Sequence, residues 1–364
     1  MSKTKPDIVF ILDSGFRGGG AERVAHRIIS AWVASGKKVT IITKSPPEYD
    51  SYLEPPGVRR LLQGAISPPR NKIEILLRII VDIFSLRRLL RDLDAPVIIS
   101  FLTLANIRTV LAGAFLGKRI IISERNDTKQ QRLFFFWRLM RRGVYRFASV
   151  VTANSKVAIE DMGDYVPLRK LALVYNPVVP AMRSATPQQS RIILSVGRLV
   201  KQKNHGLLIE AFSSLRDYNK GWTVEILGQG PEETRLVSLI QEKELSNNIR
   251  LKGFVSAPEH HYQSAGIFVL SSLYEGTPNA LLEAMAHGVP CLVPDNIPGA
   301  LTHIEDGVTG LIFRAGDPQS LADKLAVLIA DSNLRKCLGE AGRQRILPFA
   351  LDNVVANWDN LCGY

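Results

Sequence analysis

Short apolar runs alternate with longer amphipathic stretches along most of the chain. In the N-terminal half the runs that predict buried strands are Asp7–Leu12, Lys38–Thr43, Val97–Phe101, Arg119–Ser123, Val150–Ala153 and Leu171–Tyr175. Ala21–Ser35 and Ile73–Arg91 place apolar residues at helical spacing. The pattern then restarts, with a helix at His205–Leu215 and strands at Arg191–Val196, Thr223–Leu227, Ile249–Leu251, Ile267–Ser271, Pro290–Val293 and Gly310–Phe313. Strands that alternate with helices indicate parallel sheets covered on both faces.

The two series predict two domains, which suits a chain of 364 residues. Each is expected to be a doubly wound, Rossmann-like α/β domain, and they join near Asn176–Pro180 and Ser184–Ser190. We place the N-terminal domain at residues 1–183 and the C-terminal domain at 184–348. Ligands of open parallel sheets bind at the carboxyl ends of the strands, so two such domains predict an interdomain cleft.

Composition narrows the class of protein. No apolar run reaches the roughly 18–20 residues that span a bilayer, and the apolar run Ile8–Leu12 is too short for a signal peptide. The three cysteines show no metal-binding spacing, which favours a reducing cytosol without disulfides or zinc.

Charge is distributed unevenly. Residues 1–190 carry 30 lysines and arginines against 15 acidic residues, whereas residues 191–364 carry 16 against 19. A strongly basic N-terminal half indicates a polyanionic partner, which could be a membrane surface, a phosphorylated acceptor or a nucleic acid.

The first predicted strand runs into a glycine-rich segment, Asp13–Glu22, ahead of a predicted helix. Glycines allow a ligand to approach the backbone, and a helix N-terminus attracts anions, so this is a candidate anion site. The segment has neither the dinucleotide-binding nor the P-loop pattern. The second strand ends in Thr43-Lys44 and not in an acidic residue, which disfavours a dehydrogenase.

Two cations follow the first strand of the C-terminal half. Arg198 and Lys203 both come after Arg191–Val196 and before a predicted helix. Two cations at the end of a buried strand suit a diphosphate. For either residue alone, a solvated basic loop would be the simpler interpretation.

Two glutamates, Glu275 and Glu283, flank the start of another predicted helix. Thr277 is a suitable N-cap and Pro278 suits the first helical position, and we expect the helix to run from Asn279 to about His287. Backbone N–H groups around Gly276–Asn279 could hold sugar hydroxyls, while Glu283 reaches a ribose diol. The spacing does not indicate the facing carboxylates of a glycoside hydrolase.

Three motifs occur together in this chain: Glu275-x7-Glu283, Gly197-Arg198 with Lys203-Asn204, and Gly18-Gly-Gly-Ala-Glu-Arg23. In combination they resemble the retaining glycosyltransferases of family 4, which have the two-domain GT-B fold. The resemblance implies sugar transfer from a nucleotide-sugar donor, such as a UDP-sugar, without a metal or other cofactor. It implies that Arg198 and Lys203 neutralise the leaving diphosphate, that Glu275 contacts the donor sugar and Glu283 the ribose, and that Gly19 and Gly20 line the donor–acceptor cleft. Residues 349–364 would form a terminal helix that packs back on the N-terminal domain.

The segment Ser123-Glu-Arg-Asn126 departs from the family pattern. Many members carry a histidine here that contacts the donor sugar, so Glu124 and Arg125 become candidate contacts for the sugar or the acceptor. A similar stretch, with Gly-Gly-Ala-Glu-Arg upstream, occurs in bacterial enzymes that extend lipid-linked oligosaccharides, often with N-acetylgalactosamine. The resemblance therefore implies a lipid-diphosphate-linked glycan acceptor and a role in polysaccharide biosynthesis.

No acidic residue lies between Asp127 and Glu160, a window with seven cations: Lys129, Arg132, Arg138, Arg141, Arg142, Arg146 and Lys156. Large apolar residues are interleaved, which is typical of a basic amphipathic helix at a membrane interface. We expect Arg138, Arg141 and Arg142 to face an anionic membrane, with the enzyme peripheral on the cytoplasmic face. A helix that packs its aromatic residues inward explains the pattern equally well, and no nucleic-acid-binding module is present.

Other functions stay open at this stage. A nucleotide-sugar epimerase or phosphorylase of the same fold, or a non-enzymatic nucleotide- or nucleic-acid-binding module, would share part of this pattern. The Asp92-Leu-Asp94 triplet has the form of a metal-binding D-x-D motif but ends a predicted helix, so we interpret it as a solvated helix end. His260 and His261 are likewise expected at the surface, and we predict no metal site.

Overall fold

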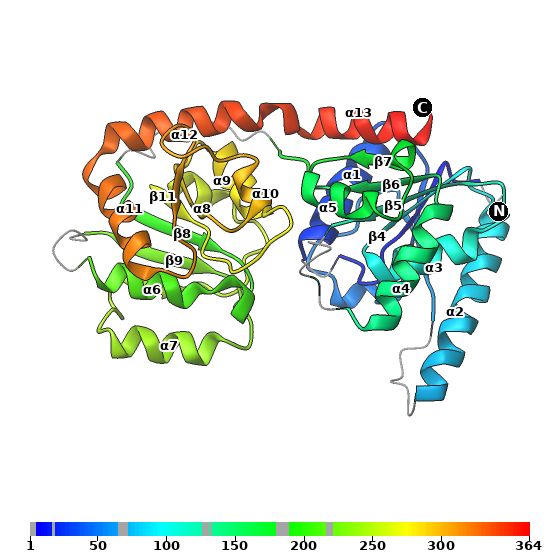
Figure 1. Ribbon diagram of the computed structural model, residues 1–364, viewed down its shortest axis with the longest axis horizontal. Helices are drawn as coiled ribbons and strands as arrows, with labels where there is room; N and C mark the ends of the chain where they lie inside the picture. The colour runs from blue at the N-terminus through cyan, green and yellow to red at the C-terminus, as the bar shows by residue number, and fades with distance from the viewer. Residues whose placement is uncertain are drawn as a thin grey trace. The chain divides into compact units, whose positions relative to one another are not determined.

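The computed structural model describes residues 5–16, 19–64, 72–125, 131, 133–179, 189–215 and 221–364. The chain divides into two compact units (Figure 1). Unit 1 comprises Met1–Pro177 with Leu351–Tyr364, and unit 2 comprises Val178–Ala350. The sequence placed these divisions at 183/184, which lies outside the described residues, and at 348/349.

Unit 1 is built on a parallel sheet. Its strands in the described residues are β1 (Ile8–Ile11), β2 (Val39–Thr43), β3 (Arg59–Leu62), β4 (Val97–Phe101), β5 (Arg119–Glu124), β6 (Val150–Ala153) and β7 (Leu171–Leu173). They pair in the order β3-β2-β1-β4-β5-β6-β7. The helices are α1 (Gly20–Ala34), α2 (Lys72–Leu93), α3 (Thr103–Gly113), α4 (Phe135–Val144), α5 (Lys156–Gly163) and α13 (Leu351–Cys362).

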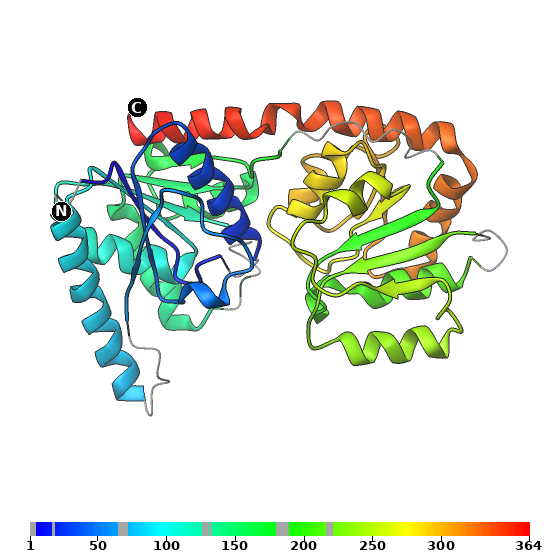
Figure 2. The same cartoon turned by 180° about the vertical axis from the view of Figure 1, so that it is seen from behind.

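The central strand β1 of unit 1 is apolar on both faces, as a sheet covered on both sides requires. Ile8 and Phe10 of β1 pack with α1 and α13, whereas Val9 and Ile11 pack with α2, α3, α4 and α5. Figures 1 and 2 show α1 on one side of the sheet and α2, α3 and α4 on the other. Side chains alternate between the faces of a strand, so each strand contributes to two cores.

The C-terminal helix α13 completes the core of unit 1. Trp358 is fully buried, with its ring centroid 5.6 Å from that of Phe101 and 6.4 Å from that of Trp32. Asp359 accepts a hydrogen bond from Trp32 Nε1 over 2.8 Å. The last helix of the chain is therefore an integral part of the N-terminal fold.

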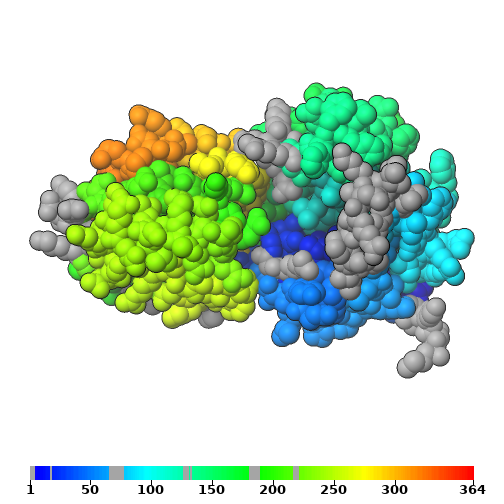
Figure 3. Space-filling model, turned by 90° about the horizontal axis from the view of Figure 1, so that it is seen from below, coloured from blue at the N-terminus to red at the C-terminus, as the bar shows by residue number. Residues whose placement is uncertain are grey.

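Unit 2 repeats the plan. Its strands are β8 (Ile192–Val196), β9 (Thr223–Leu227), β10 (Ile249–Leu251), β11 (Ile267–Val269), β12 (Cys291–Pro294) and β13 (Leu311–Phe313), all parallel, in the order β10-β9-β8-β11-β12-β13. Its helices are α6 (His205–Ser213), α7 (Glu233–Glu242), α8 (Glu259–Ser264), α9 (Asn279–Ala286), α10 (Pro298–Leu301), α11 (Pro318–Ala330) and α12 (Ser332–Ile346). The space-filling view shows α7, in yellow-green, on the outside of this unit (Figure 3).

Both sheets confirm the predicted pair of doubly wound α/β domains, and both have a switch point where the strand order reverses. It lies between β1 and β4 in unit 1 and between β8 and β11 in unit 2. Ligands of open parallel sheets bind outside the carboxyl ends of the strands at such a point. The loops that follow these four strands are therefore where a site is expected.

Candidate active site

The switch point of unit 2 brings together two of the predicted catalytic side chains. Lys203 lies in the loop after β8 and Glu275 in the loop after β11, 72 residues apart in the sequence. The Lys203 ammonium forms an ion pair with Glu275 Oε1, and these side chains are only 17% and 12% exposed. The Ser272 hydroxyl donates to the same carboxylate oxygen over 2.8 Å. The ion pair is therefore built into the fold and is not a loose surface contact.

Arg198, the third predicted catalytic residue, is exposed. No side-chain hydrogen bond or ion pair links it to another described residue. Two hydrogen bonds nearby join the loop after β8 to the loop after β11. The Leu273 amide donates to the Gln202 carbonyl, and Gln202 Nε2 donates to the Tyr274 carbonyl, both over 2.8 Å. The Arg198 guanidinium thus remains available to an anion beside a fixed pair of loops.

A glycine turn after β9 packs against the loop that carries Arg198. Gly228 has φ +143°, and a Cβ added there would lie 1.9 Å from the Gly197 carbonyl oxygen. A Cβ on Gly230 would lie 2.4 Å from the Leu199 carbonyl oxygen. Only glycine permits so close an approach of two backbones, so this turn supports the site without having to touch a ligand.

His205, the first residue of α6, contacts the backbone of the same loop. It is 3% exposed, with Nδ1 3.3 Å from Ser195 Oγ and Nε2 3.3 Å from the Gly197 carbonyl oxygen. Burial, together with the nearby Lys203 ammonium, lowers the pKa of His205 to about 4. The sequence did not indicate a role for His205, although this residue directly follows Lys203-Asn204.

Unit 2 should lose stability on acidification, because it contains two histidines of low pKa. Burial lowers the pKa of His303 to about 4, as it does that of His205. Both folded-state values lie below the ordinary value of 6.5, so the unfolded chain binds more protons as the pH falls from 6.5 to 4. At pH 4.5 each histidine should therefore lower the free energy of unfolding by about 2–3 kcal/mol relative to pH 7. Urea unfolding at pH 7 and pH 4.5 measures this loss. His205→Gln should reduce the pH dependence, and an identical dependence in that variant would contradict the assignment.

The predicted sugar-binding turn leads from Glu275 into α9. Gly276, Thr277 and Pro278 form the turn, and Thr277 and Pro278 are buried. The helix begins at Asn279 with Pro278 as N-cap, so the prediction of Thr277 as N-cap was wrong by one residue. A Cβ on Gly299 of α10 would lie 1.6 Å from the Gly276 carbonyl oxygen. This close packing fixes the turn and, with it, the backbone N–H groups at the helix start.

Glu283 lies on the second turn of α9 and is 6% exposed. The Tyr262 hydroxyl donates to its Oε2 over 3.0 Å. The Tyr262 ring in turn stacks on His287, with a centroid distance of 5.3 Å and an angle of 21° between the planes. The carboxylate is thus held in one position, as a residue that grips a ligand must be.

In unit 1, the glycine-rich segment after β1 is only partly described, since Arg17 and Gly18 lie outside the described residues. Gly19 is the N-cap of α1 and Gly20 is its first residue. The Glu22 carboxylate folds back to accept a hydrogen bond from Ser14 Oγ over 2.5 Å. A carboxylate of the chain itself therefore already lies at the helix N-terminus where the sequence predicted an anion.

Glu124 and Arg125, the candidate sugar or acceptor contacts, are both buried at the end of β5. Glu124 is fully buried and accepts a hydrogen bond from the Tyr145 hydroxyl, and burial raises the pKa of its carboxyl. The Arg125 guanidinium lies 4.5 Å from the Phe101 ring centroid and donates to Asn176 Oδ1 over 2.8 Å. Both side chains contact the interior of unit 1, and their role toward a ligand stays a prediction.

The three arginines predicted to face a membrane do not share one environment. Arg138 and Arg142 are exposed on α4. Arg141 is 4% exposed, with Nη2 4.0 Å from Asp161 and Nη1 donating to Gln131 Oε1 over 3.3 Å. The prediction was therefore wrong for Arg141, because the helix turns this side chain inward, to within ion-pair distance of Asp161.

The remaining polar motifs have structural explanations. Asp94 pairs with Lys118 and Lys5, and these two lysines lower its pKa to about 2. His261 Nδ1 lies 2.8 Å from Glu225 Oε2 and is 20% exposed, while its neighbour His260 is exposed. Across the described ranges, no three histidine, cysteine or acidic side chains gather as metal ligands would.

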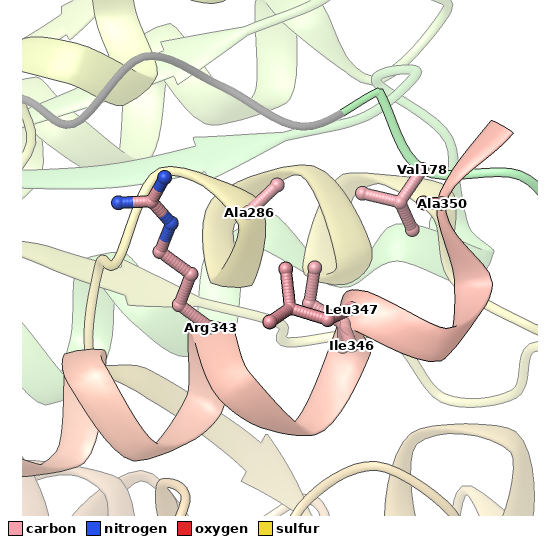
Figure 4. Close-up of a pocket in the computed structure, with 6 residues that line it drawn as sticks. All are labelled: Val178, Ala286, Arg343, Ile346, Leu347 and Ala350. Carbon is pink, nitrogen blue, oxygen red and sulfur yellow. The ribbon is translucent and has the colours of Figure 1, made fainter. Parts of the chain in front are cut away.

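One small cavity lies at the end of α12 (Figure 4). Its volume is about 10 Å³, roughly the space that one water molecule needs. It is lined by Val178, Ala286, Arg343, Ile346, Leu347 and Ala350. The cavity is therefore too small for a sugar or a nucleotide and is distinct from the predicted site.

Both halves of the chain match known protein families. Residues 18–181 match the family described as Glycosyltransferase Family 4, and residues 182–345 match Glycosyl transferases group 1. These ranges contain the site residues of both units.

Individual relatives are similar to this chain over different shares of its length. A Campylobacter jejuni N-acetylgalactosamine-N,N'-diacetylbacillosaminyl-diphospho-undecaprenol 4-alpha-N-acetylgalactosaminyltransferase is 26% identical over 359 residues, 94% of either chain. An exopolysaccharide phosphotransferase of Streptomyces coelicolor is 29% identical over 279 residues, which cover 76% of this chain but only 29% of that protein. The crystal structure of Anabaena HepE in complex with UDP superposes with a TM-score of 0.83 at 16% identity, covering 98% of this chain and 99% of HepE. The chain has the GT-B fold and belongs to family 4 of the glycosyltransferases.

Proposed function

We propose that the enzyme transfers a sugar from a UDP-sugar to a glycan carried on a lipid diphosphate, with retention of the anomeric configuration. The observation that carries this proposal is the Lys203–Glu275 ion pair at the switch point of unit 2, with the exposed Arg198 in the same loop. The site thus holds two cations for a leaving diphosphate and one carboxylate for the donor sugar.

Lys203 suits the leaving group for a geometric reason. An ammonium has three N–H donors, and in this structure Glu275 accepts from one of them. The others can donate to phosphate oxygens while the ion pair persists. Arg198 would add the planar, bidentate contact that phosphates favour. As the glycosidic bond to the donor breaks, negative charge develops on the diphosphate, and cations already in place stabilise it.

Other residues would hold the rest of the donor. Backbone N–H groups of Gly276, Thr277 and Asn279 lie at the start of α9, where they suit sugar hydroxyls. Glu283, held by Tyr262, would accept hydrogen bonds from a ribose diol. In unit 1, Gly19 and Gly20 would bring the backbone at the start of α1 close to a ligand, beside the Glu22 carboxylate that already lies there.

A lipid-linked acceptor is supported by the name of the Campylobacter relative, which acts on a diphospho-undecaprenol substrate. It is also supported by α4 of unit 1, whose Phe135, Phe136 and Leu139 are 71%, 50% and 58% exposed. Aromatic and cationic side chains together on one exposed helix suit the interface of an anionic membrane. Within the described residues, no helix is both long and apolar enough to cross a bilayer.

The direct test is a screen of UDP-sugars with lipid-linked oligosaccharide acceptors, followed by mass measurement of the products. We expect the acceptor mass to increase by one sugar residue, with release of UDP. An altered sugar that stays on UDP, or a sugar phosphate formed from inorganic phosphate, would instead indicate an epimerase or a phosphorylase. No sugar transfer with any donor and acceptor would refute the proposal.

We predict that transfer needs no divalent metal, because Arg198 and Lys203 supply the positive charge that a metal would otherwise bring to the diphosphate. Activity should stay within about twofold when EDTA is added to metal-free buffer. Loss of activity in EDTA that is restored by manganese, but not by a monovalent salt, would contradict this prediction.

A further inference from the structure

A buried tyrosine lies behind the carboxylate that the proposed donor site offers to a ribose. Tyr262 is on α8 and is 1% exposed. Its hydroxyl donates to Oε2 of Glu283, which is 6% exposed on α9. An aromatic ring alone could fill this part of the core. The hydroxyl adds a directional contact, and that contact ends on a residue of the proposed site.

The ring of Tyr262 is held between two other rings. It stacks on His287, with a centroid distance of 5.3 Å, and its centroid lies 6.3 Å from that of Phe268 in β11. His287 Nδ1 in turn lies 2.8 Å from the backbone carbonyl oxygen of Glu283. We call Tyr262, Glu283 and His287 the Tyr262 group. Its three members contact one another, so the hydroxyl has little freedom to leave the carboxylate.

The short helix α8 is also anchored independently of the Tyr262 group. His261 Nδ1 lies 2.8 Å from Oε2 of Glu225 in β9, and Ser190 Oγ donates to the Ser264 carbonyl at the end of α8. Consecutive residues of α8 thus connect it to the sheet on one side and to α9 on the other. The position of the Tyr262 hydroxyl is therefore set by the packed core of unit 2 and not by a loop.

A carboxylate fixed in this way can read hydroxyl groups by their position. An ionised carboxylate accepts about four hydrogen bonds, and the contact with Tyr262 uses only one of them. A site that is built to bind a ligand hydroxyl loses affinity for an analogue without it, because a polar group of the protein is then left unpaired. The loss is larger when the carboxylate is not free to turn toward another partner.

We propose that Tyr262 is a positioning residue of the donor site. Its hydroxyl fixes Glu283 so that the enzyme selects ribonucleotide donors, such as UDP-sugars, over 2′-deoxyribonucleotide donors, such as dTDP-sugars. This inference rests on the proposed function, in which Glu283 binds the ribose of the donor. It adds the residues that set the selectivity: Tyr262, which orients the carboxylate, and His287, which holds the ring of Tyr262.

The test compares UDP with 2′-deoxy-UDP, which share the base and the diphosphate. Calorimetry measures the affinity of the full-length enzyme for each. A hydrogen bond to a charged group corresponds to about 10–100-fold in affinity, so the unaltered enzyme should bind UDP about 30-fold more tightly than 2′-deoxy-UDP. Tyr262→Phe removes only the hydroxyl. It should weaken binding of UDP by about tenfold and leave the affinity for 2′-deoxy-UDP nearly unchanged, so that the preference falls to about threefold.

The matched control is Tyr145→Phe. Tyr145 is also fully buried, and its hydroxyl also donates to a buried glutamate, Glu124, but it lies in unit 1. Both variants should unfold at a lower temperature than the unaltered enzyme, because each leaves a buried carboxylate short of one donor. Only Tyr262→Phe should change the preference for UDP over 2′-deoxy-UDP. If Tyr262→Phe does not fold, His287→Asn replaces it, since this change removes the stacked ring but keeps an N–H donor.

In steady-state assays, Tyr262→Phe should raise the KM for the UDP-sugar by about tenfold with a smaller change in kcat, because the ribose is remote from the bond that breaks. Equal weakening of UDP and 2′-deoxy-UDP would overturn the inference, since the hydroxyl would then serve only the stability of the fold. An equal loss of preference in Tyr145→Phe would overturn it too. If the unaltered enzyme binds UDP without preferring it to 2′-deoxy-UDP, this inference fails and the proposed function stands. If it binds no UDP, both fail.

Discussion

Replacing Arg198 or Lys203 with alanine should lower the rate of sugar transfer by about 10²–10³-fold, the usual cost of removing one preorganised electrostatic contact. The diphosphate gains charge only as its bond to the sugar breaks, so the loss should fall on kcat as well as on kcat/KM. Rates with a UDP-sugar and a lipid-linked acceptor measure the effect.

Lys201→Ala is the matched control, because Lys201 is an exposed lysine of the same loop. It should retain near-normal activity. Arg198→Ala should unfold at the same temperature as the unaltered enzyme, since Arg198 is exposed. Lys203→Ala should unfold at a lower temperature, because it leaves Glu275 without its cation. Near-normal turnover in both Arg198→Ala and Lys203→Ala would rule out the diphosphate assignment.

Replacing Arg138, Arg142 and Arg146 with glutamate should release the enzyme from anionic liposomes. All three side chains are exposed on α4 or just after it, beside the exposed Phe135 and Leu139. Each cation near an anionic surface contributes about 1 kcal/mol. Loss of three should weaken binding by about 100-fold, and the reversed charges should weaken it further. Sedimentation with liposomes measures the bound fraction, which should also fall as salt is added.

The control for this variant reverses three exposed cations of unit 2, Arg250, Arg314 and Lys336. It has the same net charge as the α4 variant, and it should stay bound to the liposomes. Transfer to a short, soluble acceptor should be similar in both variants. Liposome binding that survives in the α4 variant would favour the alternative interpretation, a packed helix with solvated arginines.

The fold could be predicted from the sequence because buried parallel strands are apolar on both faces. Runs such as Val97–Phe101 are strongly apolar, and the structure places strands there to within two residues. The edge strand β3 was missed, since Arg59-Arg-Leu-Leu62 is partly exposed and lacks a buried run. Edge strands need only one neighbour and tolerate charge, so hydrophobicity alone does not reveal them.

The site could be predicted in part. Lys203 and Glu275 were identified because both follow buried strands, and parallel strands end at the same edge. Arg141 was misplaced, because a run of arginines on a helix does not show which one turns inward. Trp137, Met140 and Val144 pack against the core, and Arg141 lies on that same side of α4.

The anomeric configuration of the product is the most direct test of sugar transfer with retention. The measurement is the NMR coupling constant of the anomeric proton in the product formed from an α-linked UDP-sugar and a lipid-linked acceptor. We expect an α-linked product, because the proposed transfer retains the configuration of the α-linked donor. A β-linked product, or a donor sugar that is released to water and never joined to the acceptor, would contradict it.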